Sequence, residues 1–66
     1  MRIVLNGEEI EIHDGATLDA LVRDRGLADA ACATEVNRRL VPKADRVDAR
    51  LRVDDRVEIV TLVGGG

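Results

Sequence analysis

The apolar run Val57–Val63 is the feature that most constrains the fold of this chain. Its residues are mostly β-branched, and both of its alternating faces are largely apolar. Such a run is typical of a strand in the middle of a sheet, covered on both sides. Arg2–Leu5 is a second, nearly continuous apolar run. One helix is predicted between them, so we expect these strands to be parallel neighbours at the sheet centre, with hairpins outside them.

The first hairpin is predicted by the pair Asn6-Gly7. An Asn-Gly pair between two apolar runs favours a type I′ turn, because both of its positions need φ > 0. The following run, Glu8–Ile12, alternates acidic residues with isoleucine. This period of two indicates a half-exposed edge strand, whose carboxylates discourage pairing with another sheet edge.

A short helix is predicted at residues 18–25, after a turn at His13–Ala16. Thr17 stands at the position of an N-cap. The apolar side chains that follow recur at helical spacing and form one stripe. Gly26 is expected at the C′ position, and Leu27 can provide the apolar contact of a Schellman motif.

The second half of the chain predicts another hairpin and then an irregular segment. We expect Ala30–Val36 and Arg39–Val41 to be strands joined at Asn37-Arg38, with Pro42 ending the second one. The polar stretch 43–50 predicts a turn or a short 3₁₀ helix. Leu51 and Val53 are expected to return to the core before a turn at 54–56. Together these elements predict an α+β domain, with a mixed sheet of four to five strands and one helix packed across one face. We expect a single domain at residues 1–63 and a flexible C-terminal tail at residues 64–66.

Composition excludes several classes of function. The chain has 66 residues, no aromatic residue, a net charge of −3 and a pI near 5.0. Without aromatic or overall basic character, nucleic-acid binding is not expected. There is no apolar leader and no run long enough to span a membrane, so we expect a soluble, cytoplasmic protein that is a monomer when free. Charge is uneven: residues 1–36 carry −5 and residues 37–56 carry +3, which could orient a partner.

Side chains offer little chemistry. A nucleophile–base pair of Cys32 and His13 would need both on neighbouring elements with a third orienting group, and the pattern suggests neither. We expect Cys32 to be a small buried strand residue and His13 a solvated turn residue. One Cys and one His among scattered carboxylates show no metal-ligand spacing. We therefore expect no catalytic residue and no metal site.

The glycine run Gly64-Gly65-Gly66 is the remaining candidate site. Without Cβ atoms it can lie in a channel too narrow for other residues. A C-terminal carboxylate at Gly66 would be ionised at neutral pH, with an unperturbed pKa near 3.5. It could attack the α-phosphate of ATP and form an acyl-adenylate. Because this chain has no machinery for that step, a partner would have to supply the ATP and Mg²⁺.

The chain as a whole resembles the ThiS family of sulfur-carrier proteins of thiamine biosynthesis, which have the ubiquitin-like β-grasp fold. The stretches that carry the resemblance are Ile3-x-x-Asn6-Gly7, Thr17-Leu18-x-x-Leu21-Val22, Glu35–Lys43 with its Val-Asn-x-x-x-Val-Pro-Lys pattern, and Val57–Val60 leading to Val63–Gly66. One departure is the turn before the last strand, where family members usually carry Gly-Asp and this chain has Asp54-Asp55. Asp enters the left-handed region only at some cost, which puts the geometry of this turn in doubt.

The resemblance implies a function for the glycine tail. The carboxylate of Gly66 would be adenylated by an E1-like enzyme of the ThiF type and then converted to a thiocarboxylate. The sulfur would come from a donor such as a cysteine desulfurase system and pass to thiazole synthase of the ThiG type. Gly65 and Gly66 would be the functional pair, Gly64 would extend the tail, and the apolar sheet surface would be the docking face. The chain would be a protein cosubstrate and not an enzyme.

Two alternatives stay open at this point. The chain could be a related β-grasp sulfur carrier that serves molybdopterin, cysteine or tRNA thiolation. It could also be a ubiquitin-like binding module that acts without covalent chemistry. Loss of Gly65 and Gly66 would abolish the function of a carrier and leave a binding module almost unaffected.

Overall fold

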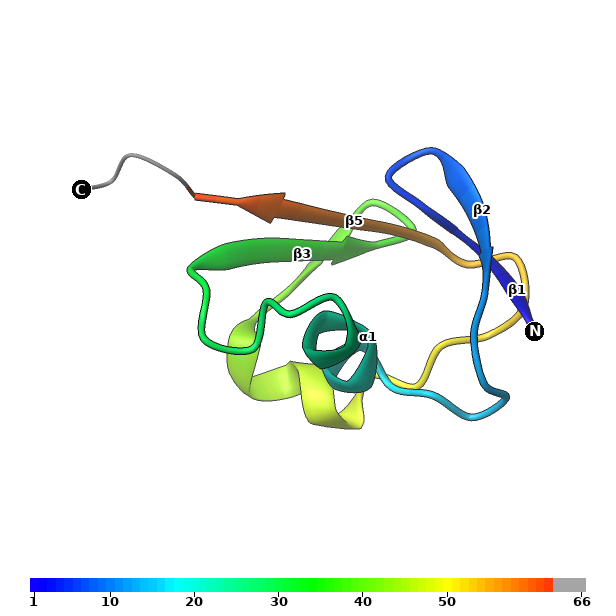
Figure 1. Cartoon of the computed structure of the whole chain (residues 1–66), viewed down its shortest axis with the longest axis horizontal. Helices are drawn as coiled ribbons and strands as arrows, with labels where there is room; N and C mark the ends of the chain where they lie inside the picture. Colours follow the sequence, from blue (N-terminus) through cyan, green and yellow to red (C-terminus); the bar gives the residue numbers. More distant parts are fainter. Residues whose placement is uncertain (63–66) are drawn as a thin grey trace.

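A five-stranded mixed sheet with one α-helix across one face forms the domain (Figure 1). The structure, a computed structural model, describes residues 1–62. Along the chain the elements are β1 (Arg2–Leu5), β2 (Glu8–Glu11), α1 (Leu18–Asp24), β3 (Cys32–Val36), β4 (Arg39–Val41), the 3₁₀ helix η1 (Lys43–Asp48) and β5 (Arg56–Thr61). The predicted fold class and the order of elements are confirmed.

The strand order β2-β1-β5-β3-β4 places the last strand at the centre. β5 pairs in parallel with β1 through Val4↔Arg56 and Leu5↔Val57. On its other side β5 pairs antiparallel with all of β3. The two hairpins, β1–β2 and β3–β4, therefore meet only through β5. The predicted parallel pairing of the first and last strands, with hairpins outside, is confirmed.

The turns follow the backbone preferences of their residues. Asn6 and Gly7 both have positive φ, 50° and 83°, as the predicted type I′ turn requires. Asn37 and Arg38 repeat the pattern with φ of 51° and 68°. Asp54 also lies in the left-handed region, at φ 68°. The Asp54-Asp55 sequence thus retains a turn that glycine would form more easily, which resolves the doubt raised by the sequence.

Helix α1 begins where its sequence predicts, and both of its caps are those that the sequence predicts. The Thr17 hydroxyl accepts a hydrogen bond from the backbone N–H of Ala20, at 3.1 Å. At the other end the N–H groups of Gly26 and Leu27 donate to the carbonyls of Arg23 and Val22, at 2.9 and 3.0 Å. These two bonds are those of a Schellman motif. The helix ends at Asp24, one residue before the predicted end.

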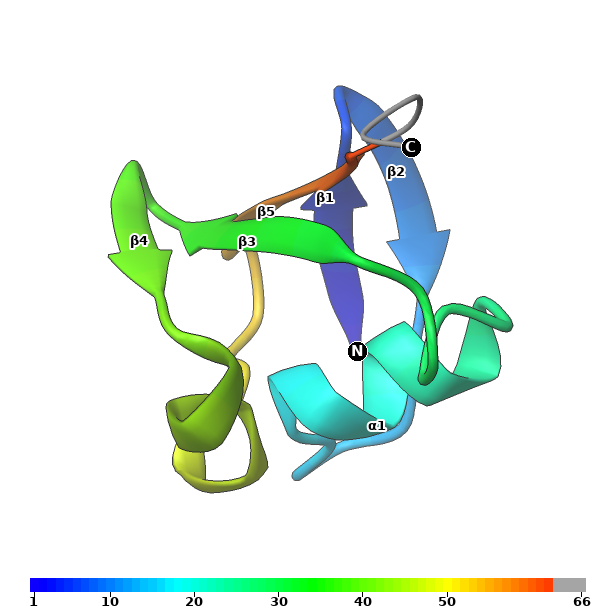
Figure 2. The same ribbon diagram turned by 90° about the vertical axis from the view of Figure 1, so that its left-hand side faces the viewer.

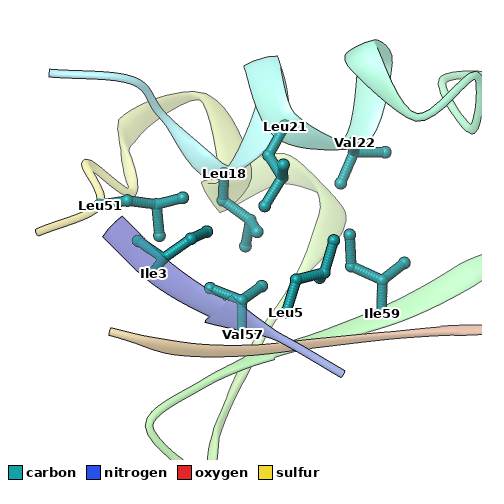
Figure 3. Close-up of a cluster of buried hydrophobic side chains, with 8 residues drawn as sticks. All are labelled: Ile3, Leu5, Leu18, Leu21, Val22, Leu51, Val57 and Ile59. Atoms are coloured by element: carbon teal, nitrogen blue, oxygen red, sulfur yellow. The ribbon is translucent and has the colours of Figure 1, made fainter. Parts of the chain in front are cut away.

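The core lies between α1 and the facing side of the sheet (Figure 3). α1 contributes three buried side chains that point toward those of β1 and β5, and Leu51 closes one end. With no aromatic residue in the sequence, the core consists of branched aliphatic side chains, each of which gains roughly 1.5–3 kcal/mol on burial. The buried hydrophobic residues are Ile3, Leu5, Leu18, Leu21, Val22, Leu51, Val57 and Ile59.

Several sequence expectations are wrong in detail. β5 is central in the sheet, but only one of its faces is covered: Val57 is 1% exposed and Val60 is 56% exposed. β1 is likewise covered on one face only, since Arg2 is exposed and Val4 half-buried. Val53 was expected to point to the core and is exposed. A single helix can cover only one side of a sheet, and continuous apolar runs do not reveal which side is left open.

Candidate functional site

The predicted site, Gly64–Gly66, lies outside the described residues, so the structure positions it only through the strand that leads to it. That strand is held by β3 along almost its whole length. Cys32 pairs with Thr61 across β3 and β5, and the N–H of Leu62 donates to the carbonyl of Ala31 at 2.9 Å. Strand β5 therefore carries the chain, anchored up to Leu62, toward the glycine run.

Asn6 extends the support of β5 beyond the short β1 strand. Its side-chain amide donates to the carbonyl of Ile59 at 3.2 Å, and its side-chain oxygen accepts the N–H of Ile59 at 2.9 Å. The Asn6 side chain thus forms the pair of hydrogen bonds that another strand residue would form. The sequence identified Asn6 only as a turn residue, and nothing in its pattern indicates this second role.

Arg46 ties η1 to the other side of the sheet. It is only 5% exposed, although it stands in a stretch that the sequence marks as polar. Its guanidinium donates to the Thr34 hydroxyl at 3.0 Å and to the carbonyl of Cys32 at 2.8 Å, while the Thr34 hydroxyl donates to the carbonyl of Val41 at 2.8 Å. This network connects η1, β3 and β4 beside the end of β5. Sequence reasoning missed it because buried and exposed arginines look alike in a polar segment.

The face of the sheet opposite α1 is uncovered by any element among residues 1–62 (Figure 2). Alternation along β5 places Glu58 and Val60 there, because Val57 and Ile59 point to the core. From β4, Leu40 joins this open face, since it pairs with Glu35 while the neighbouring Thr34 is fully buried. Leu40 and Val60 are 67% and 56% exposed, so the open face presents apolar area beside the strand that leads to the glycines.

The alternative nucleophile–base site is excluded by the register of the strands. Cys32 pairs with Thr61 at one end of β5, whereas Glu11, two residues before His13, pairs with Arg2 at the far end of β1. Because Val4 is aligned with Arg56, these two ends are about seven strand residues apart, or roughly 20 Å. As predicted, His13 is exposed; Cys32 is half-buried and not fully buried.

The surface of residues 1–62 is hollowed at two places. The larger, about 490 Å³, runs between the end of β2 and the side of α1. It contains His13, but no group of three His, Cys, Asp or Glu side chains in residues 1–62 is placed to hold a metal ion. The smaller, about 230 Å³, lies on the sheet near the two type I′ turns and is lined by Val4, Gly7, Arg38, Arg56, Val57 and Glu58. Neither hollow gathers groups for catalysis.

The resolved electrostatic perturbations lie away from the end of β5. The pKa of the Met1 amino group is raised above its usual value, chiefly by its hydrogen bond to Asp14, 3.1 Å away. The guanidinium pKa of Arg2 is raised by its bond to Asp54, and that of Arg23 by its bond to Asp19. The pairs of Met1 and Arg2 lie at the start of β1, and the pair of Arg23 lies on the exposed face of α1. No described helix is long and apolar enough to cross a membrane.

The layout of a sheet with a central last strand and one covering helix defines the ubiquitin-like β-grasp class. A solved structure of the thiamine biosynthesis protein ThiS from Geobacter metallireducens superposes with a TM-score of 0.84 over 100% of both chains, at 20% sequence identity. The model of the ThiS family matches residues 2–66. The chain belongs to the ThiS family.

Two curated relatives carry a longer chain. One is a thiazole synthase from Paramagnetospirillum magneticum, 35% identical over all 66 residues, and the other is a thiazole synthase from Magnetococcus marinus, 36% identical over the same span. In each case the matched region is 20% of the relative. The present chain therefore spans about a fifth of the length of these proteins.

Proposed function

We propose that this chain is a sulfur carrier of thiamine biosynthesis whose reactive group is the C-terminal carboxylate of Gly66. The observation that carries the proposal is the match to the ThiS family, which runs through the glycine run to residue 66. The fold supports it, because the anchored central strand leads directly to these glycines. In this role the chain is a cosubstrate and contributes no catalytic residue.

The proposed chemistry has three steps on the tail. A carboxylate oxygen of Gly66 attacks the α-phosphorus of ATP, the bond to the pyrophosphate breaks, and an acyl-adenylate forms. The terminal sulfur of a persulfide on a donor such as a cysteine desulfurase system then attacks the acyl carbon and displaces AMP, which forms an acyl disulfide. A second thiol of the donor attacks this disulfide, so that a thiocarboxylate remains on Gly66 and a disulfide on the donor. An E1-like enzyme of the ThiF type supplies the ATP site and the Mg²⁺, which stabilise the charge that develops on the phosphate.

The proposed acceptor of the sulfur is a thiazole synthase of the ThiG type. Its support is that two proteins named thiazole synthase contain a region similar to the whole of this chain. Gly64, Gly65 and Gly66 are proposed to enter the partner active sites, where only a chain without side chains fits. From Val60, six residues of chain reach at most about 20 Å, so the partner that takes Gly66 must lie close to the sheet.

Intact mass spectrometry tests this function. The protein is incubated with the adenylating enzyme of its source organism, ATP, Mg²⁺ and a sulfide source, and the C-terminal peptide is fragmented. We expect a product heavier by the difference between one sulfur and one oxygen atom, located on Gly66. A Cys32→Ala variant is the control, because sulfur on that thiol is then impossible and the same product should form.

Removal of Gly65 and Gly66 separates the carrier from the alternatives. The shortened chain should fold normally and form no product, whereas a binding module would keep its activity. Delivery of the sulfur to a molybdopterin, cysteine or tRNA acceptor, and not to thiazole synthase, would show a related carrier. A tail that remains a plain carboxylate under all of these conditions would refute the proposal.

A further inference from the structure

Both hairpins use the asparagine of their turn to bind the central strand. In the β1–β2 hairpin, the Asn6 side chain accepts the N–H of Ile59 at 2.9 Å and donates to the carbonyl of Ile59 at 3.2 Å. In the β3–β4 hairpin, the Asn37 side chain accepts the N–H of Arg56 at 2.9 Å and donates to the Asp55 carboxylate at 3.0 Å. Two asparagines with positive φ thus bind the central strand at two different points along the chain.

The two points differ in their distance from the glycine run. Arg56 begins β5, eight residues before the first glycine of the run, whereas Ile59 lies five residues before it. On the β1 side of β5 the ladder ends with Leu5↔Val57. In the part of the chain that the structure describes, no hydrogen bond from that side reaches β5 beyond Ile59. Asn6 is therefore the last partner on that side before the glycines.

Beyond Ile59, the described part of β5 is held from one side only. Residues 60–62 are bonded to β3 and to the carbonyl of Ala31. A strand that is paired along one edge can tilt about that edge, and hydrogen bonds on its other edge oppose the tilt. The seven residues from Ile59 to Gly66 span at most about 25 Å. A tilt of about 5° at Ile59 would then move the end of an extended tail by about 2 Å. Reaction rates are sensitive to such a displacement, since a misplacement of about 1 Å can lower a rate about 100-fold.

We infer that Asn6 is a positioning residue for the reaction of the C-terminal carboxylate, because its two bonds to Ile59 fix the direction in which β5 presents the glycine run. This inference rests on the proposed function, in which Gly66 is adenylated. Asn6 does not take part in the chemistry and acts only through Ile59. Loss of the two bonds should leave the docking of the sheet unchanged, and it should lower the fraction of bound molecules whose carboxylate is placed to attack ATP. Such a change lowers kcat and leaves KM almost unaltered.

Glycine substitutions test the inference, because glycine retains both turns and removes only the side-chain bonds. The parent, Asn6→Gly and Asn37→Gly are adenylated by the enzyme of the source organism, and pyrophosphate release is measured at increasing carrier concentration. The assay is run at a temperature at which all three proteins are folded. We expect Asn6→Gly to lower kcat about tenfold, with KM within about twofold of the parent. Asn37→Gly is the matched control: it makes the same change in the same kind of turn at the start of β5, and both of its kinetic parameters should stay within about twofold of the parent.

Two further measurements support the comparison. Amide hydrogen exchange should be faster at Ile59 in Asn6→Gly and at Arg56 in Asn37→Gly, which shows that each variant has loosened the intended point. Asn6→Asp retains the acceptor for the N–H of Ile59, so it should lower kcat less than Asn6→Gly does. It also gives the direction of the effect should the glycine variant fail to fold.

Three outcomes overturn the inference. A kcat of Asn6→Gly within about twofold of the parent would show that the reaction does not depend on the bonds to Ile59. An equal loss of kcat in Asn37→Gly would reduce the effect to the general stability of β5. A higher KM with unchanged kcat would assign Asn6 to docking and not to placement of the carboxylate. If the parent is adenylated and Asn6→Gly behaves like it, this inference alone fails; if the enzyme does not adenylate the parent, the proposed function fails as well.

Discussion

At the scale of single residues, polar side chains form hydrogen bonds that backbone groups usually form. Asn6 adopts a positive φ for its turn and uses its amide to pair with Ile59, which β1 is too short to reach. Arg46 uses its guanidinium to satisfy the carbonyl of Cys32. In a domain of 66 residues, where a thin core leaves little stability in reserve, each such side chain has a measurable effect.

Asn6→Asp should lower the free energy of unfolding by about 1–2 kcal/mol. The new carboxylate still accepts the N–H of Ile59, but it has no donor for the carbonyl of Ile59 and repels it. Asp tolerates positive φ nearly as well as Asn, so the turn itself is preserved. Urea unfolding at neutral pH measures the loss. Because protonation restores a donor, the gap to the parent should narrow as the pH falls below about 4. A gap independent of pH would contradict this explanation.

At the scale of elements, the two hairpins use the same turn with different residues. Asn6-Gly7 has glycine at the second position, whereas Asn37-Arg38 has an arginine at φ 68°. A residue with a Cβ atom is strained in that region by about 1–2 kcal/mol. The turn of the β3–β4 hairpin is therefore less stable than that of the β1–β2 hairpin. Substitution of Arg38 by glycine should relieve the strain.

Arg38→Gly should raise the free energy of unfolding by about 0.5–1 kcal/mol, after the greater entropy of glycine in the unfolded chain is subtracted. Arg39→Gly is the matched control, because Arg39 lies in β4 and its substitution removes a side chain from a strand. That variant should lose stability, and thermal or urea unfolding distinguishes the two. A loss of stability in Arg38→Gly would show that the arginine side chain contributes more than its backbone strain costs.

The Met1 amino group, at the open end of the β1–β2 hairpin, should make the stability of the domain depend on pH in the alkaline range. The Met1 amino group donates to the carbonyl of Ile12 at 2.7 Å and pairs with Asp14. Its pKa is raised in the folded state, mainly by the bond to Asp14. A raised pKa means that the stabilisation is complete below the unfolded pKa, near 8, and is lost as the pH rises through the folded pKa.

We expect the unfolding midpoint to fall as the pH increases above about 8, and less so in Asp14→Asn. Acetylation of the amino group is a second control, since the acetylated protein should show neither the gain at neutral pH nor the loss at alkaline pH. Urea unfolding at several pH values measures all three proteins. An alkaline slope that Asp14→Asn leaves unchanged would assign the effect to other groups.

At the scale of the whole molecule, one layer of helix against one sheet leaves half of the sheet surface available. Two valines of β5 show the contrast: Val57 is 1% exposed and Val60 is 56% exposed. The buried one supports the fold, and the exposed one is part of the open face. The β-grasp arrangement therefore uses one side of this strand for the core and leaves the other side exposed.

Val57→Ala should lower the free energy of unfolding by about 2 kcal/mol or more, through lost burial and the cavity that remains. Val60→Ala, the same change in the same strand, should cost less than about 1 kcal/mol. Under the proposed function it should instead weaken binding to thiazole synthase. Similar losses of stability in the two variants would contradict the one-sided burial of β5.

Sequence and structure agree where the physics is local or periodic. Residues close together in the chain determine the caps of α1, the turn at Asn6-Gly7 and the pairing within each hairpin, β1–β2 and β3–β4. The burial of Arg46 and the bonds of Asn6 to Ile59 do not, because they depend on which segments meet in space. The glycine site was predicted from the sequence and the family resemblance alone, and it stays a prediction because Gly64–Gly66 lie outside the described residues.

The central position of β5 couples completion of the fold to the proposed reaction of the C-terminal glycines. Without β5 the two hairpins share no ladder, so the sheet assembles only when the last strand joins the first. Such long-range pairing is the slow and cooperative part of folding. The same strand leads to the proposed reactive glycines. A chain that has not completed its fold therefore lacks the open face as well as the anchored strand. Under the proposed function, an activating enzyme that requires both would use ATP only on folded molecules.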